Sequence, residues 1–103
     1  MLIYNVTNKV DPAIAQEWLD WMKTSHVPDV MRTGLFSNYR ICRLDQVEED
    51  AEPTFVIQYH CESREKLALY LEQHAPALRE EVIAKYGNRF VAFRTIMEVV
   101  QGA

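Results

Sequence analysis

The chain has 103 residues, of which 49% are hydrophobic and 11% are aromatic, so we expect one domain over residues 1–103 with a single modest core. Its formal net charge is −4 and its Lys and Arg residues form no cluster, which excludes the nucleic-acid-binding class, because such proteins concentrate positive charge on one face. No apolar run approaches the ~20 residues that cross a bilayer, and the N-terminus lacks secretory signal features. We therefore expect a cytoplasmic protein with no nucleic-acid partner and no membrane contact.

A short β-rich run at residues 2–7 predicts the first strand. Asp11 follows as a helix N-cap, with a proline at the first helical position, where the missing N–H costs nothing. Pro28 disfavours helical geometry at the residue before it, so this helix is expected to end or kink at residues 25–27. A short turn over residues 30–33 then precedes the second strand.

The second half of the chain repeats this order of elements. Ser63 caps a second amphipathic helix, which Pro76 is expected to kink and Gly87 to end. A charged connection over residues 48–53 is too short for a helical crossover, so the strands on either side of it are expected to be antiparallel. The remaining strands are predicted at residues 36–47, 54–61 and 90–100.

The two halves also share a His-x-Pro motif late in each helical pattern. His26 and Pro28 carry the first motif, and His74 and Pro76 carry the second. Each motif is followed, after a glycine, by a run that is typical of a strand, so the chain reads as two β-α-β units. Right-handed crossovers then predict an α+β, ferredoxin-like β-α-β-β-α-β antiparallel sheet with its helices on one face.

Both faces of the last predicted strand are apolar. Val91 and Phe93 alternate with Phe90 and Ala92, whereas a sheet face in water shows polar residues at every second position. We therefore expect a second copy of the chain to cover the face that the helices leave open, in a two-fold homodimer. The polar residues expected on this dimer face are Asn5, Gln58, His60, Arg94 and Glu98.

Arg94 is unusual because it lies in an otherwise apolar strand. An arginine inside a sheet needs a partner, and we expect an ion pair with Glu98 on the same face or with Glu98 of the partner subunit. Alternatively, its planar guanidinium binds a carboxylate or a phosphate.

Several sequence blocks, in the right order, resemble one bacterial protein family. The blocks are Ile3-Tyr4-Asn5-Val6-Thr7, Trp18-Leu19-x-Trp21-Met22, His26-x-Pro28, Thr33-Gly34-Leu35-Phe36, Gln58-Tyr59-x-Cys61, His74-Ala75-Pro76-x-Leu78 and Phe90-Val91-Ala92-Phe93-Arg94-Thr95. They resemble the family catalogued as domain of unknown function 4286. This resemblance implies a ferredoxin-like fold of the dimeric α/β-barrel group, without an assigned activity. More distantly, the architecture is similar to small monooxygenases of antibiotic biosynthesis, which use the cavity between sheet and helices.

Five residues are candidates for binding a small ligand between the sheet and the helices. They are Trp21, His26, Tyr59, Tyr70 and His74. His26 either caps the C-terminal end of its helix, where the helix dipole favours an imidazolium, or donates a hydrogen bond at the mouth of a pocket. The aromatic residues either line that pocket or belong to the core.

The sequence contains no Ser-His-Asp set, glycine-rich phosphate loop, paired carboxylates or Cys-x-x-Cys, so we assign no catalytic residue and expect no cofactor. A metal site is not expected either, because the three histidines lie on different predicted elements. Two functions stay open: binding of a small ligand or partner, or cofactor-independent monooxygenase or isomerase chemistry by His26 or His74 with Tyr59. A cavity of at least ~300 Å³ at these residues would favour a ligand.

Overall fold

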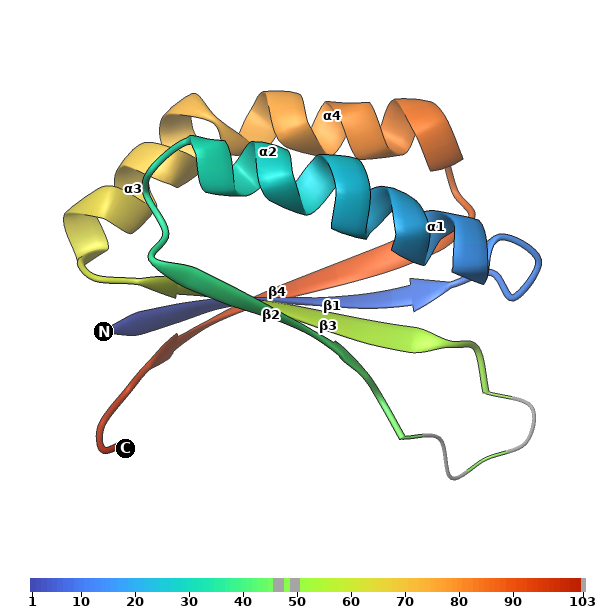
Figure 1. The fold of residues 1–103 in the computed structure, drawn as a ribbon, viewed down its shortest axis with the longest axis horizontal. Helices are drawn as coiled ribbons and strands as arrows, with labels where there is room; N and C mark the ends of the chain where they lie inside the picture. The colour runs from blue at the N-terminus through green and yellow to red at the C-terminus, as the bar shows by residue number, and fades with distance from the viewer. Residues whose placement is uncertain (46–47, 49–50, 103) are drawn as a thin grey trace.

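A computed structural model of the chain describes residues 1–45, 48 and 51–102 and shows one four-stranded antiparallel sheet in the order β2-β3-β1-β4 (Figure 1). The strands are β1 (Leu2–Val10), β2 (Asn38–Arg43), β3 (Thr54–Cys61) and β4 (Phe90–Glu98). In this order, β3 lies between β1 and β2, and β1 lies between β3 and β4, so each β-α-β unit is split by one strand of the other unit. The predicted α+β, ferredoxin-like fold is confirmed.

All helices cover the same face of this sheet (Figure 1). The first helical segment of this layer consists of α1 (Ala15–Trp21), the π-helical turn η1 (Met22–His26) and α2 (Val27–Arg32). The second consists of α3 (Arg64–Gln73) and α4 (Ala75–Tyr86). Within the part of the chain that the structure describes, no helix is both long enough and apolar enough to cross a bilayer.

Several element boundaries differ from the predicted ones. Strand β1 continues three residues beyond residue 7, because Val10 pairs with Phe90 of β4. Helix α1 begins only after a turn in which the Asp11 carboxylate accepts the N–H of Ala13 at 2.9 Å. The predicted end of the second strand at residues 46–47, and residues 49–50 of the charged connection, lie outside the described residues.

The first helix does not end at Pro28, so the prediction of a short turn over residues 30–33 is wrong. The chain instead inserts the π-helical turn η1, in which the Val27 N–H donates to the Met22 carbonyl five residues back. A proline lacks an N–H and crowds the carbonyl four residues earlier, which here belongs to Thr24. We infer that the wider turn accommodates Pro28, which then starts α2.

The second helix does break where Pro76 predicts. His74 separates α3 from α4, with φ −121° and ψ −40°, and Pro76 lies in the first turn of α4. Its missing N–H therefore costs little, because the first-turn donors of a helix have no partner within it. Ser63 caps α3 as expected, since its Oγ accepts the N–H of Lys66 at 3.2 Å.

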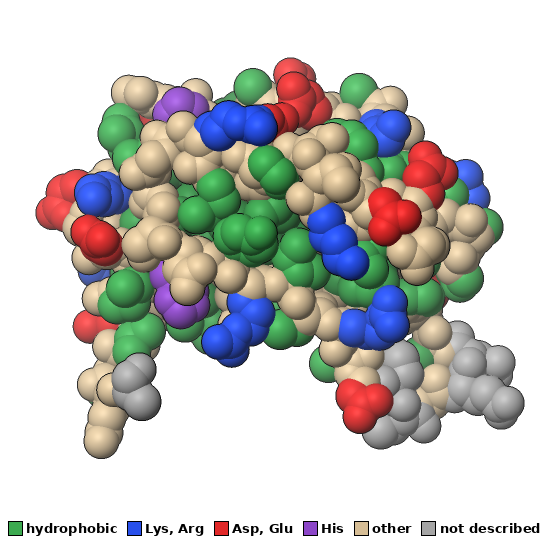
Figure 2. Space-filling view, in the orientation of Figure 1, with side chains coloured by type: hydrophobic (Ala, Val, Ile, Leu, Met, Phe, Trp, Pro, Cys, Tyr) green, Lys and Arg blue, Asp and Glu red, His purple; other side chains and the backbone are tan. Residues whose placement is uncertain are grey.

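The core lies between the helices and the sheet, where hydrophobic side chains gather in the middle of the molecule and charged ones surround them (Figure 2). Trp18 is 0% exposed, and its ring stacks on Phe55 at a centroid distance of 5.4 Å. A second cluster joins Phe36, from the segment before β2, to Tyr70 of α3 at 4.7 Å. These contacts pack both helical segments onto the sheet.

The opposite face of the sheet carries no helix (Figure 1). Three of the residues predicted for a dimer face lie there: Asn5 is opposite Gln58, whose amide donates to the Asn5 carbonyl oxygen at 3.2 Å, and His60 is opposite Ile3. Their role in a dimer stays a prediction. We call this surface, formed by Ile3, Asn5, Thr7, Val56, Gln58, His60, Val91, Phe93, Thr95 and Met97, the open face.

The prediction that Arg94 and Glu98 share this face is wrong. Arg94 pairs with Val6, whose side chain points toward the helices, and Glu98 bonds to Arg64 of α3 at 3.3 Å. The two alternating sets of side chains in β4 are about equally apolar, so its sequence pattern could not say which set the helices cover. The described residues contain no Arg94–Glu98 ion pair, because Glu98 pairs with Arg64 instead.

Candidate functional site

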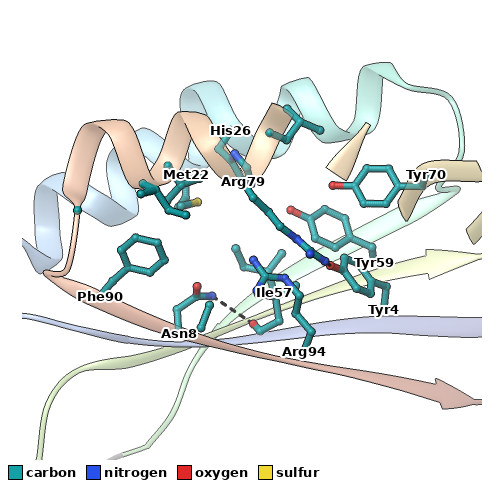
Figure 3. Close-up of a pocket in the computed structure, with 16 residues that line it drawn as sticks. Tyr4, Asn8, Met22, His26, Ile57, Tyr59, Tyr70, Arg79, Phe90 and Arg94 are labelled. Atoms are coloured by element: carbon teal, nitrogen blue, oxygen red, sulfur yellow. Dashed lines mark hydrogen bonds between the residues drawn. The ribbon is translucent and has the colours of Figure 1, made fainter. Parts of the chain in front are cut away.

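A cavity of about 360 Å³ lies between helix α4, turn η1 and strands β1, β3 and β4 (Figure 3). Most of its walls are apolar or aromatic, with contributions from Val6, Ile57, Val82 and Phe90. Its volume exceeds the ~300 Å³ that separates a ligand site from packing gaps. The cavity lies toward the β4 edge of the sheet, beneath α4.

Tyrosines form one end of this cavity. The rings of Tyr4 and Tyr59 stack at 6.1 Å, and Tyr70 meets Tyr4 edge-on at 5.8 Å. Burial, followed by the neighbouring tyrosines, raises the pKa of the Tyr59 hydroxyl well above its usual range, and burial likewise raises the pKa of Tyr70. Both hydroxyls therefore stay protonated at neutral pH and can donate hydrogen bonds to a ligand.

Two arginines enter the cavity, Arg79 from helix α4 and Arg94 from strand β4 (Figure 3). Nη2 of Arg79 donates to the hydroxyl of Tyr4 at 2.9 Å, whereas its buried Nε has no partner among the described residues. Within these residues, neither arginine pairs with a carboxylate and no Asp or Glu lines the cavity. The site therefore carries uncompensated positive charge.

His26 lines the same cavity from the end of turn η1. Burial, which the Arg94 cation reinforces and Asp29 opposes, lowers the pKa of His26 from 6.5 to about 4. The alternative in which His26 caps the end of its helix as an imidazolium is wrong, because the helix continues from η1 into α2 and the side chain makes no capping hydrogen bond. Its buried Nδ1 has no partner among the residues described.

Three of the five predicted ligand-binding residues, His26, Tyr59 and Tyr70, line the cavity, although binding itself stays a prediction. The other two lie behind them: Trp21 stacks on His26 at 5.6 Å, and the His74 ring stacks on Tyr70 at 6.3 Å. Trp21 and His74 therefore position the lining residues and do not contact the cavity themselves.

Sequence reasoning missed Arg79, which is the most consequential polar residue in the cavity. A signal was present, because Ala75, Arg79, Val82 and Tyr86 recur at helical spacing and therefore share one side of α4. The other three are buried, so a charged residue at this spacing has to enter the protein interior. Such a residue is typical of a ligand-binding site or of a buried ion pair.

No three His, Cys, Asp or Glu side chains of the described residues lie close enough together to hold a metal ion. Arginines, tyrosine hydroxyls and a neutral imidazole surround the cavity instead. These groups donate hydrogen bonds to anions and carbonyl oxygens, and only the imidazole among them is an ordinary metal ligand.

Solved structures share this architecture. An EthD family protein from Bacillus halodurans superimposes with a TM-score of 0.70 at 13% identity, over 95% of this chain and 98% of that one. An antibiotic biosynthesis monooxygenase gives 0.66 at 16% identity over 98% and 100%. SnoaB, a cofactor-independent oxygenase from Streptomyces nogalater, gives 0.66 at 12% identity over 98% and 94%. A search of curated proteins found no significant match.

The sheet order, the one-sided helices and these similarities define a ferredoxin-like α+β protein with the fold of antibiotic biosynthesis monooxygenases and EthD-like proteins. A family model covers residues 1–100, and the chain belongs to the family described as domain of unknown function (DUF4286). The resemblance noted in the sequence is thereby confirmed. At these identities the solved structures establish the fold, and the fold alone does not specify an activity.

Proposed function

We propose that the protein binds a small organic ligand in the cavity between α4 and the sheet. The observation that carries this proposal is a cavity of about 360 Å³ with largely apolar and aromatic walls, which Arg79 and Arg94 also line although no Asp or Glu of the described residues does. A ligand can bury its apolar part against these walls and place polar groups against the arginines and the tyrosine hydroxyls.

A fragment screen by heteronuclear NMR tests this proposal. Aromatic and alicyclic fragments should shift the backbone amide signals of residues around the cavity, such as Tyr59 and Arg79. Ala92 lines the cavity, so Ala92→Trp should fill it and abolish these shifts. Ala84→Trp is the matched control, because Ala84 is exposed on α4. Binding that survives Ala92→Trp unchanged, or a screen without any cavity-specific shift, would refute the proposal.

We also propose that two copies of the chain associate through their open faces. Phe93 is 54% exposed, Val91 51% and Met97 36%, and all three lie on this surface. Four strands spaced about 4.8 Å apart and about eight residues long present about 500 Å². Two such faces bury about 1,000 Å² in total, which is near the lower limit for a specific interface. A second copy also supplies the matching apolar surface, because a two-fold contact uses the same patch twice.

Sedimentation velocity tests the homodimer. The parent protein should sediment as a dimer at micromolar concentration, and Phe93→Lys should give a monomer, because it places a charge in the middle of the apolar contact. Leu69→Lys is the matched control, since Leu69 is an equally apolar, exposed residue on α3. A monomeric parent, or a Phe93→Lys variant that still dimerises fully, would contradict the proposal.

A second candidate function is cofactor-independent oxygenation, which the neutral His26 imidazole inside the cavity favours. Because its pKa is about 4, this imidazole is a weak base, so it would orient an already ionisable phenol by a hydrogen bond while the phenolate reacts with oxygen. Oxygen-electrode measurements with 1,4-dihydroxynaphthalene should then show consumption above the spontaneous rate for the parent and not for His26→Gln. Equal rates with the parent, the variant and no protein would exclude this activity for that class of substrate.

A further inference from the structure

Two arginines without a carboxylate partner among the described residues place positive charge at one part of the cavity. Arg79 comes from the helical layer and Arg94 from the sheet, and both side chains reach the cavity near the tyrosine end (Figure 3). The Arg79 guanidinium is held there by its hydrogen bond to Tyr4 at 2.9 Å.

Three arginines elsewhere in the described structure have acidic partners. Arg89 donates to Asp11 at 3.1 Å, Arg64 to Glu98 at 3.3 Å, and Arg32 pairs with Asp29. These pairs are exposed, so they contribute little to stability. The contrast matters for the cavity, because Arg79 is partly buried and points its unpartnered Nε into the protein interior. A buried cation normally receives a partner, and within the described residues the chain supplies no carboxylate to this one.

The rest of the cavity selects the body of the ligand. Val6, Ile57, Val82 and Phe90 present apolar surface to the cavity, and Tyr4 and Tyr59 present ring faces and edges. Flat apolar groups pack well against such rings. The two arginines reach the cavity near the tyrosine end, whereas Met22, Phe90 and the uncharged Asn8 amide lie toward the other end (Figure 3). The site therefore suits an amphipathic molecule with one charged end.

We propose that the ligand is an aromatic or alicyclic carboxylate whose carboxylate lies between Arg79 and Arg94 and whose ring system occupies the apolar part of the cavity. This inference rests on the proposed function and specifies its ligand class. The planar guanidinium forks match a carboxylate, and the Tyr59 and Tyr70 hydroxyls lie where they can donate to it as well.

Three probes of the same size separate this inference from general apolar binding: 2-naphthoate, 2-naphthamide and 2-naphthylmethylammonium. We expect 2-naphthoate to bind about tenfold more tightly than the amide, because hydrogen bonds to charged groups are the stronger ones. The ammonium probe should bind least, because two cations face it. Isothermal titration calorimetry at one ionic strength measures all three affinities on the full chain.

Two variants assign the preference to the arginines. Arg94→Gln should reduce the preference for 2-naphthoate over the amide about tenfold while leaving amide binding unchanged, and Arg79→Gln should do the same. Arg94 is exposed, so its variant keeps the test valid even if loss of the Arg79 bond to Tyr4 prevents folding. Arg40→Gln is the matched control, because Arg40 is an exposed strand arginine whose partner Gln58 lies on the open face.

Each result has one meaning for this inference. A tenfold preference that Arg94→Gln removes and Arg40→Gln preserves supports it. Equal binding of acid and amide by the parent overturns the carboxylate assignment and leaves the proposed ligand site standing. Failure of all three probes to bind overturns both. An equal loss in the Arg94 and Arg40 variants attributes the preference to overall charge and overturns the role of the two arginines.

Discussion

Acidification should destabilise this protein through His26 before most carboxylates titrate. The pKa of His26 is about 4 in the folded protein and about 6.5 in an unfolded chain. Between these values the unfolded state binds a proton that the folded state does not. The free energy of unfolding contributed by His26 is therefore fully present above about pH 6.5 and falls as the pH decreases toward 4.

The magnitude follows from these two pKa values. Lowering the pH from about 7 to about 5 should remove about 2 kcal/mol from the free energy of unfolding through His26. Urea unfolding measures this loss, and an m value near 2 kcal/mol per molar converts it into a midpoint shift of about 1 M. His26→Phe retains an aromatic ring against Trp21 and removes the titrating group, so its midpoint should fall by about 1 M less over the same range.

NMR titration of the His26 imidazole gives an independent measure. Arg94→Gln should raise the pKa of His26, because the Arg94 cation helps to lower it. The reasoning is refuted if the parent and His26→Phe lose the same stability between about pH 7 and about pH 5, or if His26 titrates near its ordinary value of about 6.5.

Three further substitutions test the packing and the backbone by urea unfolding. Trp18→Ala should cost about 3–5 kcal/mol, because Trp18 is 0% exposed and stacks on Phe55; Trp18→Phe should cost much less, and equal losses would contradict the packing argument. Ser63→Ala should cost about 1 kcal/mol through loss of the cap on α3, with no loss expected if the cap were unimportant. Gly87→Ala should cost about 1–3 kcal/mol because φ is +58° there and nothing crowds an added Cβ, so an unchanged midpoint would rule out backbone strain as the reason for glycine.

The local signals in the sequence predicted the elements well. Strand β3 has the predicted bounds Thr54–Cys61, because every second residue from Phe55 to Cys61 is apolar and the run is rich in β-forming residues. The break at His74 follows from the geometry of Pro76. The same rule failed at Pro28, where a π-helical turn let the helix continue. Proline restricts its own turn of the backbone, and packing of the helix on the sheet decides which of the permitted geometries is used.

The candidate site was predictable in part. His26, Tyr59 and Tyr70 were found because their residue types and their places on predicted elements bring them to the space between helices and sheet. Arg79 was missed and Arg94 was assigned to the wrong face. The Arg94 error concerns the direction of a side chain across the sheet, which depends on the pairing of its strand and not on the residue type. Arg79 was overlooked although its helical spacing placed it on the buried side of α4.

The sequence by itself determined the order of strands and helices, the ferredoxin-like class and the apolar character of both faces of β4, because these depend on residue patterns along the chain. Only the tertiary structure decided which face of β4 meets the helices and therefore that Arg94 and Arg79 enter one cavity. The physical reason is that a strand with two equally apolar faces has no preferred side of its own. Its pairing with β1 and the helices that cover one face of the sheet make that choice.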